Sequence, residues 1–162
     1  VRGGYNFGAP GDRIDRSGEV WLAVTSSKKE NAQWEPREVA WLDGYTTDDE
    51  RFPAFSAAVG IEKLTLPVKF GSKPGKENQT RKYRVQLWFA EPSAAPGERV
   101  FHVHLEGEQV LENLDIAKAA GGARKPLIKE FTVDVTDGLD LEFHSVQGQP
   151  LINAVRLELI EN

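Results

Sequence analysis

YRVQLWFAE, residues 83 to 91, is the stretch of the sequence that decides the fold. Residues 98–111 and 152–159 repeat its pattern, in which apolar and polar residues alternate along the chain. A period of two is typical of a β-strand that turns one face to a core and the other to water. These segments therefore predict a protein built from sheets.

Further strands are predicted around residues 5–7, 20–24, 61–70, 129–135 and 139–143. Turn residues separate the strands at intervals of about 8 to 12 residues, and helical periodicity is almost absent. The sequence predicts an all-β fold, an antiparallel β-sandwich of jelly-roll type. The expected core is Phe101, Val103, Leu105, Phe131, Val133, Leu141, Phe143, Val155, Leu157 and Leu159.

Several local features refine this prediction. Pro67 is expected at an edge, a bulge or a strand end, because proline cannot donate to a sheet ladder. Asp137-Gly138 is expected to turn the strand 129–135 back into the strand 139–143 as a hairpin. Residues 114–122 predict one helical turn that the glycines end. Residues 25–55 lack a clean period, which predicts long loops with a short strand near residues 38–42.

Composition limits the classes of function. The 162 residues suit a single domain, 1–162, and no run approaches the roughly 20 apolar residues of a membrane helix, so no membrane insertion is expected. The net charge of −5 argues against a nucleic-acid partner. The absence of cysteine excludes disulfides, thiolate catalysis and cysteine-ligated zinc. The absence of methionine, with Val1 first, predicts a piece excised from a larger protein.

A set of motifs, in their order along the chain, resembles the malectin-type carbohydrate-binding module. They are Phe89-Ala90-Glu91, Arg99-Val100-Phe101-x-Val103, Glu106-Gly107, Leu114-Asp115-Ile116, Ala120-Gly121-Gly122 and Ile152-Asn153-Ala154-Val155, with weaker support from Asn6-Phe7-Gly8 and Gly18-x-x-Trp21. The resemblance implies a malectin-like or galactose-binding-like sandwich that binds glucose-containing oligosaccharides in a cleft of loops and catalyses no reaction. Residues 3–13 also resemble the start of malectin-like domains in large exported bacterial proteins, which implies an extracytoplasmic location, whether secreted, periplasmic or at the cell surface.

The sequence departs from this family at two positions where the family binds its sugar. The resemblance implies adjacent aromatic residues after the Phe-Ala-Glu motif, whereas residues 92–95 read Pro-Ser-Ala-Ala. It also implies an acidic ligand contact before the last strand, where this chain has Gly148-Gln149. Trp21 alone stands where the family has an N-terminal binding aromatic. The domain therefore either binds a different glycan or has lost sugar binding.

The candidate carbohydrate-binding residues are Trp21, Trp34, Trp41, Asp43 and Tyr45. Sugars present C–H faces that stack on aromatic rings and hydroxyl groups that pair with carboxylates and amides. The alternative for each tryptophan is structural: it covers a sheet or fills a loop against the core. For Trp21, within an alternating strand, core packing and ligand contact are equally open. Trp88 is out of phase with its neighbours and faces either the opposite side of its sheet or the 25–55 loops.

Metal binding and catalysis receive little support. His102 and His104 lie two residues apart on one strand, so they share a face, with His144 as an uncertain third ligand; solvent-facing histidines are the better interpretation. Asp12, Asp15 and Glu19 offer oxygens for a structural calcium, on spacing alone. The acidic run 48–50 reads as a solvated turn, and no hydrolase, phosphate-loop or zincin motif is present. No cofactor and no metal are expected.

The sequence thus predicts a non-catalytic module that recognises a glucose-type oligosaccharide or polysaccharide. The alternative is a structural or protein-interaction domain that docks onto neighbouring domains of an exported multidomain protein and no longer binds sugar. An enzyme is not expected.

Overall fold

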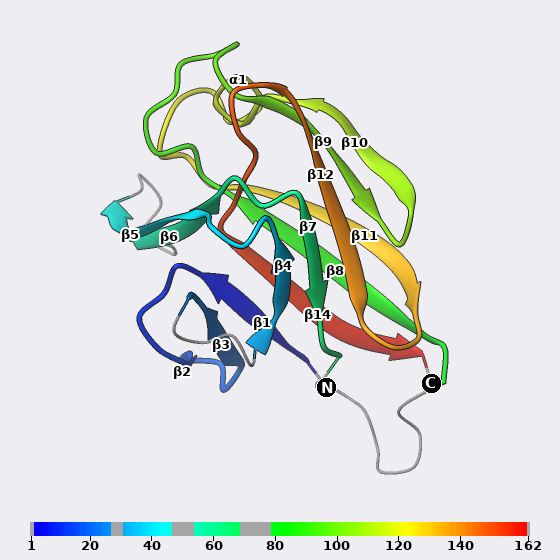
Figure 1. The fold of residues 1–162 in the computed structure, drawn as a ribbon. Coiled ribbons are helices and arrows are strands. Elements are labelled where there is room, and N and C mark those ends of the chain that lie inside the picture. Colours follow the sequence, from blue (N-terminus) through cyan, green and yellow to red (C-terminus); the bar gives the residue numbers. More distant parts are fainter. Residues whose placement is uncertain (1, 27–30, 47–53, 69–78, 162) are drawn as a thin grey trace.

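Three β-sheets make up the part of the chain that the computed structural model describes, residues 2–26, 31–46, 54–68 and 79–161 (Figure 1). A six-stranded sheet has the order β11 (Leu127–Val135), β8 (Arg81–Phe89), β14 (Ala154–Glu161), β1 (Arg2–Phe7), β3 (Val20–Val24) and β2 (Arg13–Ile14). A five-stranded sheet has the order β10 (Glu108–Leu114), β9 (Val100–Leu105), β12 (Leu139–Gln147), β7 (Lys63–Leu66) and β4 (Gln33–Glu35). A small sheet has the order β13 (Leu151–Ile152), β6 (Ala54–Val59) and β5 (Ala40–Thr46).

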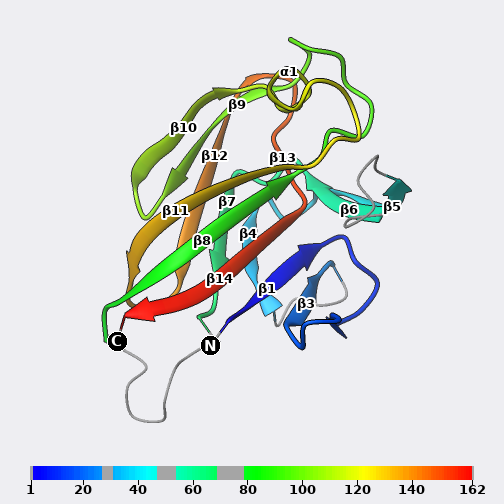
Figure 2. The same cartoon turned by 180° about the vertical axis from the view of Figure 1, so that it is seen from behind.

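The two larger sheets lie face to face and form a β-sandwich, so the predicted fold class is confirmed (Figures 1 and 2). Figure 2 shows β11, β8, β14 and β1 side by side across the face of the six-stranded sheet. Neighbouring strands pair antiparallel, except that β1 and β3 pair in parallel. The parallel pair is possible because β2 and its turn carry the chain back between β1 and β3. The finer jelly-roll assignment stays a prediction.

The core follows from the alternation in the sequence. Every second residue of β8, from Arg81 to Phe89, is buried, and the rings of Phe89, Phe101 and Phe143 link the two sheets at centroid distances of 6.0 and 6.2 Å. The predicted core residues are buried except Phe131, Val133 and Leu159, which are half-buried against it. Phe131 and Val133 lie on β11, an edge strand with a neighbour on one side alone. Their partial exposure therefore reflects the position of the strand.

One predicted hairpin is wrong. The turn at residues 137–138 joins β11 to β12, but β11 pairs with β8 in the six-stranded sheet, whereas β12 pairs with β9 and β7 in the other. The turn therefore carries the chain from one layer of the sandwich to the other. Two amphipathic strands on either side of a turn satisfy the same alternation whether they pair with each other or face each other across a core.

The prediction of long loops for residues 25–55 is also wrong for much of that region. The described part contains β4, β5 and the start of β6. A register shift between Leu42 and Tyr45 interrupts the β5–β6 ladder, which hides the period of two. The predicted short strand near residues 38–42 corresponds to β5, whereas the acidic run 48–50 lies outside the described residues.

Other local predictions are confirmed. Pro67 directly follows the last residue of β7, so it lies at a strand end. The short helix α1 (Ile116–Ala120) begins after Asp115, whose side chain accepts a hydrogen bond from the backbone N–H of Lys118. It ends at Gly121, which adopts the left-handed conformation that glycine tolerates best. Helix α1 lies at the end of the sandwich opposite to the start of β1 and the end of β14 (Figure 1).

The outer face of the six-stranded sheet carries a buried tryptophan. Trp21 is the parallel neighbour of Gly4 and packs against Trp88 with ring centroids 5.2 Å apart. A Cβ atom on Gly4 would lie 2.4 Å from the Trp21 ring and 2.9 Å from the Val155 carbonyl oxygen. The missing side chain of Gly4 therefore makes the space in which the indole lies.

We predict that Gly4→Ala destabilises the fold by about 1–3 kcal/mol, because the new methyl group displaces the Trp21 ring from a filled space. Urea unfolding followed by tryptophan fluorescence measures the change. The matched control is Gly11→Ala, since a Cβ atom there meets nothing within 4 Å, and its effect is expected to stay within about 0.5 kcal/mol. Equal stability of the two variants would contradict this packing argument.

Candidate functional site

An aromatic pair joins the five-stranded sheet to the small sheet, and each of its rings lines one of two hollows. Trp34 comes from β4, the edge of the five-stranded sheet, and Trp41 comes from β5. Their ring centroids are 5.3 Å apart and their planes meet at 83°, an edge-to-face contact. Both rings are half-buried against the core and partly open to solvent. The pair therefore combines a fixed geometry with accessible ring surface.

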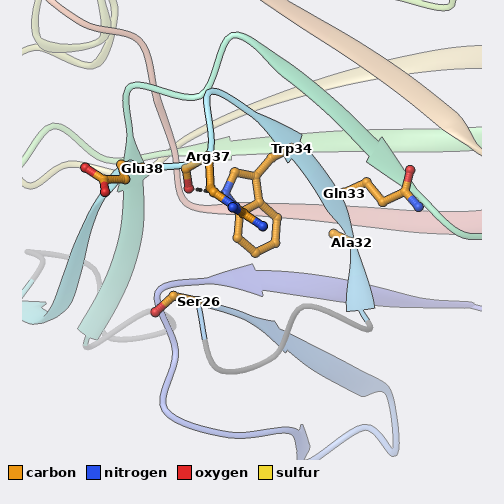
Figure 3. Close-up of a pocket in the computed structure, with 6 residues that line it drawn as sticks. All are labelled: Ser26, Ala32, Gln33, Trp34, Arg37 and Glu38. Carbon is orange, nitrogen blue, oxygen red and sulfur yellow. Dashed lines mark hydrogen bonds between the residues drawn. The ribbon is translucent and has the colours of Figure 1, made fainter.

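The first hollow, of about 410 Å³, lies on the Trp34 side of the pair. Its described lining is Ser26, Ala32, Gln33, Trp34, Arg37 and Glu38. Figure 3 shows the Trp34 indole and the Arg37 side chain projecting to the same side of the β4–β5 loop. The indole Nε1–H donates to the Arg37 carbonyl oxygen at 3.2 Å, which orients the ring. An aromatic surface thus lies among amide, hydroxyl and charged groups.

The second hollow, of about 510 Å³, lies on the Trp41 side. Its described lining is Ala40, Trp41, Leu42, Tyr45, Val59, Pro92, Ser93 and Arg99. The last three of these residues come from the segment that follows β8 and leads to β9. This hollow is therefore built from two parts of the chain about fifty residues apart.

A buried amide fixes the Tyr45 side of the second hollow. The Nδ2 group of Asn153 donates to the Tyr45 hydroxyl and, at 2.8 Å, to the Ser56 carbonyl oxygen, while Oδ1 accepts from the Ala90 N–H at 2.8 Å. The Tyr45 hydroxyl donates to the Ala90 carbonyl oxygen at 2.6 Å. Burial raises the pKa of Tyr45, so the phenol stays neutral and keeps its proton for this bond. Asn153 therefore joins the small sheet to the end of β8.

A buried ion pair shapes the other side of the second hollow. Glu91 is 1% exposed, and its Oε1 atom accepts from Arg99 Nε at 2.6 Å. Its Oε2 atom accepts from the backbone N–H groups of Ser93 and Ala94 at 3.2 and 3.0 Å. Arg99 Nη1 also donates to the Gln149 carbonyl oxygen at 2.6 Å. The β8–β9 loop is thus held together, and tied to the loop before β13, by one carboxylate and one guanidinium.

The structure brings together three of the five candidate sugar-binding residues. Trp34, Trp41 and Tyr45 line the two hollows, and Asp43 lies on β5 between Trp41 and Tyr45, although its side chain is outside the described part of the structure. Trp21 lies elsewhere, 3% exposed on the outer face of the six-stranded sheet. There it packs against Trp88, outside the hydrophobic cluster between the sheets.

The candidates chosen from the sequence did not include the residues of the β8–β9 loop that line the second hollow. Glu91 and Asn153 belong to motifs that carried the family resemblance, but each was used as a marker of the fold. Arg99 likewise opens the motif of β9. A glutamate and an arginine eight residues apart across a Pro/Gly-rich loop were the available signal for an ion pair. Pro92 and Ser93 lie where the family resemblance implied sugar-binding aromatic residues, so the loop was signalled although its side chains were not.

The oxygens considered for calcium already have protein partners. Asp15 Oδ1 accepts from the N–H groups of Ser17 and Glu19 at 2.8 and 3.0 Å, and Oδ2 accepts from Trp21 Nε1 at 2.9 Å. Glu19 pairs with Arg156 at 2.8 Å and with Arg2 at 3.0 Å. Asp12 Oδ1 accepts from the Ala23 N–H at 2.7 Å. These carboxylates therefore organise the N-terminal turn.

The histidines gather on the outer face of the five-stranded sheet. His102 is the cross-strand partner of His144, and His104 stacks on His144 with ring centroids 4.4 Å apart and planes at 28°. Stacked imidazoles direct their nitrogens within two nearly parallel planes, so the nitrogens do not converge on one ion. Across the described residues, no group of three or more His, Asp or Glu side chains is placed to hold a metal.

Comparison with known proteins identifies the family. Residues 72–155, just over half of the chain, match the malectin domain. The chain belongs to the malectin domain family. Over 62 residues this malectin domain is 39% identical to a probable LRR receptor-like serine/threonine-protein kinase from Arabidopsis thaliana. That stretch is 34% of this chain and 6% of the kinase.

Solved structures share the fold. The plant receptor-like kinase FER matches 100% of this chain over 43% of its own, with a TM-score of 0.71 and 17% identity. The ANXUR1 extracellular domain from Arabidopsis thaliana matches 99% of this chain over 42% of its own, with a TM-score of 0.69 and 17% identity. A Bacteroides uniformis beta-glucuronidase matches 99% of this chain over 18% of its own, with a TM-score of 0.70 and 19% identity. At these identities the likeness shows the fold alone.

The malectin domain spans only a small part of these relatives, 6% of the Arabidopsis kinase and 18% of the glucuronidase chain. Within its described residues, no helix has the length and apolar character needed to cross a membrane.

We predict that Arg99→Ala destabilises the domain by about 3–5 kcal/mol, because it leaves the Glu91 carboxylate buried without its charged partner. Urea unfolding of Arg99→Ala, Glu91→Gln and the double variant measures the effect and the coupling between the two residues. The loss of unfolding free energy in the double variant is expected to be smaller than the sum of the losses in the two single variants. Strict additivity would show that the ion pair does not hold the loops.

We predict that the stabilising effect of Asp15 depends on pH. Hydrogen bonds from Ser17 and Trp21 lower the pKa of Asp15 far below its usual value, so the folded state favours the ionised form. This stabilisation is complete above the unfolded-state pKa of about 4 and declines as the pH falls below it. Asp15→Asn is therefore expected to lower the free energy of unfolding at pH 7, and the deficit is expected to shrink toward pH 2.5.

Urea unfolding of both proteins between pH 2.5 and 7 measures this dependence. Asp134→Asn, a change at an exposed position on β11, is the matched control and is expected to follow the parent protein closely. A deficit for Asp15→Asn that stays constant with pH would refute the role of the ionised carboxylate.

Proposed function

We propose that this malectin domain binds a glucose-type oligosaccharide or polysaccharide at the two hollows, without catalysing a reaction on it. The observation that carries the proposal is the Trp34–Trp41 pair, which offers half-buried aromatic surface beside both hollows. Aromatic rings with a few convergent polar groups in a concave surface are typical of small-molecule sites. Family membership supports a binding module.

The polar groups suit hydroxyl recognition. Gln33 and Arg37 supply donors in the first hollow, while Ser93 and Arg99 supply them in the second. Arg99 is held by Glu91 and by the Gln149 carbonyl oxygen, so its position is set before a ligand arrives. Preorganised donors of this kind favour binding because little side-chain entropy remains to be lost. Asp43 is proposed as a further ligand contact from its place on β5, and Trp21 as a packing residue.

The state of Glu91 supports binding without turnover. Glycoside hydrolysis in most enzymes needs a pair of carboxyl groups on either side of the scissile bond. Glu91, the carboxylate behind the second hollow, is buried, and its two oxygens accept hydrogen bonds from Arg99 and from two backbone N–H groups. It is therefore poorly placed to exchange a proton with a substrate.

We further propose that residues 1–162 act as one extracytoplasmic domain of a larger protein. The buried residues of all three sheets form one continuous hydrophobic cluster, which supports a single unit. The matched relatives include a receptor-like kinase and the ANXUR1 extracellular domain, which supports a location outside the cytoplasm.

The binding experiment uses calorimetry against soluble α- and β-linked glucans. Trp41→Ala and Trp34→Ala are each expected to weaken binding at least tenfold, because removal of a central aromatic contact commonly costs more than about 1.4 kcal/mol. Asp43→Ala is expected to weaken binding to a smaller extent.

The matched control is Trp21→Phe, which changes a tryptophan on another face of the molecule and is expected to leave glucan affinity unchanged. Circular dichroism confirms that each variant is folded. Affinity that survives both Trp34→Ala and Trp41→Ala would remove the site assignment, and release of reducing sugar would exclude a purely binding role.

The second candidate function is docking onto a neighbouring domain. It is favoured by Ile14 and Val20, cross-strand neighbours at the edge of the six-stranded sheet that are 71% and 37% exposed. Exposed apolar neighbours of this kind are frequent at protein contacts. Failure of every glucan to bind, together with binding of an adjoining domain that Ile14→Ser abolishes, would favour this function.

A further inference from the structure

We propose that the two hollows are successive subsites for one uncharged glycan chain that turns as it crosses the Trp34–Trp41 pair. The inference rests on the proposed function and makes it more specific. It states that the domain recognises the interior of an extended chain whose sugar planes rotate along its length, and that it discriminates against flat ribbons and acidic chains.

The two hollows are lined by neighbouring parts of the chain and by two rings in contact. Arg37 and Glu38 line the first hollow, and Ala40 and Trp41, a few residues on, line the second. Trp34 lines the first hollow and Trp41 lines the second, and their rings are in direct contact at a centroid distance of 5.3 Å. In this proposal, a chain that leaves the first hollow passes over the Trp34–Trp41 pair into the second.

Each hollow has the volume of a small-molecule site. At about 410 and 510 Å³, each hollow lies within the range of roughly 300–1,000 Å³ typical of small-molecule sites. Linking the sugars makes the second contact intramolecular, which raises affinity without any new type of interaction. A chain that fills both hollows is therefore expected to bind more tightly than a fragment that fills one.

The angle between the rings selects the shape of the chain. A sugar stacks with its C–H face parallel to the ring that it covers. Because the two indole planes meet at 83°, sugars stacked on Trp34 and on Trp41 differ in orientation by a similar angle. Successive sugars in a flat ribbon keep nearly parallel planes, whereas a helical chain rotates them. The pair therefore fits a helical chain.

The charges select an uncharged chain. In the first hollow the described lining contains one cation and one anion, Arg37 and Glu38. In the second, the cation Arg99 is 2.6 Å from the Glu91 carboxylate. Neither hollow thus presents an excess positive charge to a carboxylate-bearing sugar. A uronic acid chain would lose hydration and would meet one anion for each cation at the two hollows.

The experiment is a calorimetric length series with the whole domain. The ligands are helical glucan oligomers (α-1,4- and β-1,3-linked), ribbon-forming β-1,4-linked oligomers and α-1,4-linked galacturonate oligomers, from two to eight sugars. We expect affinity for at least one helical series to rise at least tenfold from the disaccharide to the longest chain. The ribbon and acidic series are expected to rise by less than threefold.

The variants identify the subsites. Trp34→Ala and Trp41→Ala are each expected to remove most of the gain with length. Because either change also removes the partner of the other ring, Arg37→Ala tests the first hollow without altering the pair, and it is expected to weaken the longest chain more than the disaccharide. Arg16→Ala, at an exposed position between β2 and β3, is the matched control and is expected to leave the whole series unchanged.

The outcomes separate this inference from the proposed function. Glucan binding with no dependence on length, or an equal gain for ribbons, would overturn the two-subsite inference and leave the binding function standing. A larger gain for galacturonates would overturn the preference for an uncharged chain. Absence of binding to every glucan would overturn both proposals.

Discussion

The side-chain amide of Asn153 is the contact on which the arrangement of the site depends. It links the Tyr45 hydroxyl on β5, the Ser56 carbonyl on β6 and the Ala90 N–H at the end of β8. The residue is 1% exposed, and each buried polar group that lost its partner would cost about 1–3 kcal/mol. The small sheet that carries Trp41 and Tyr45 is therefore fixed to the sandwich by polar satisfaction as well as by packing.

The Glu91–Arg99 pair fixes the opposite wall in a similar way. The loop after β8 has small residues where the family resemblance implied aromatic ones, yet the Ser93 and Ala94 N–H groups still point to a buried carboxylate. The frame of the loop is thus present without its aromatic side chains. Aromatic surface is supplied from β4 and β5 instead, which is a physical reason to expect a ligand geometry particular to this domain.

Local alternation predicted the strands well and their partners poorly. The faces of β8, β9 and β14 follow from the sequence, because a strand between a core and water repeats every two residues. The pairing of β11 with β8 did not follow, since the same alternation fits a hairpin with β12 equally well. In β5 the register shift between Leu42 and Tyr45 concealed the second half of the strand. The aromatic content of residues 34–45 nevertheless located half of the candidate site.

The sequence by itself determined the sheet class, the inward faces of the long strands, and the helical turn between Asp115 and Gly121. These properties depend on the order of neighbouring residues, which the chain carries in any conformation. Only the tertiary structure decided that Trp34 meets Trp41, that Trp21 lies buried over Gly4, and that Glu91 pairs with Arg99. Such contacts depend on which strands become neighbours and at what register, and that choice is made by the packing of the whole core.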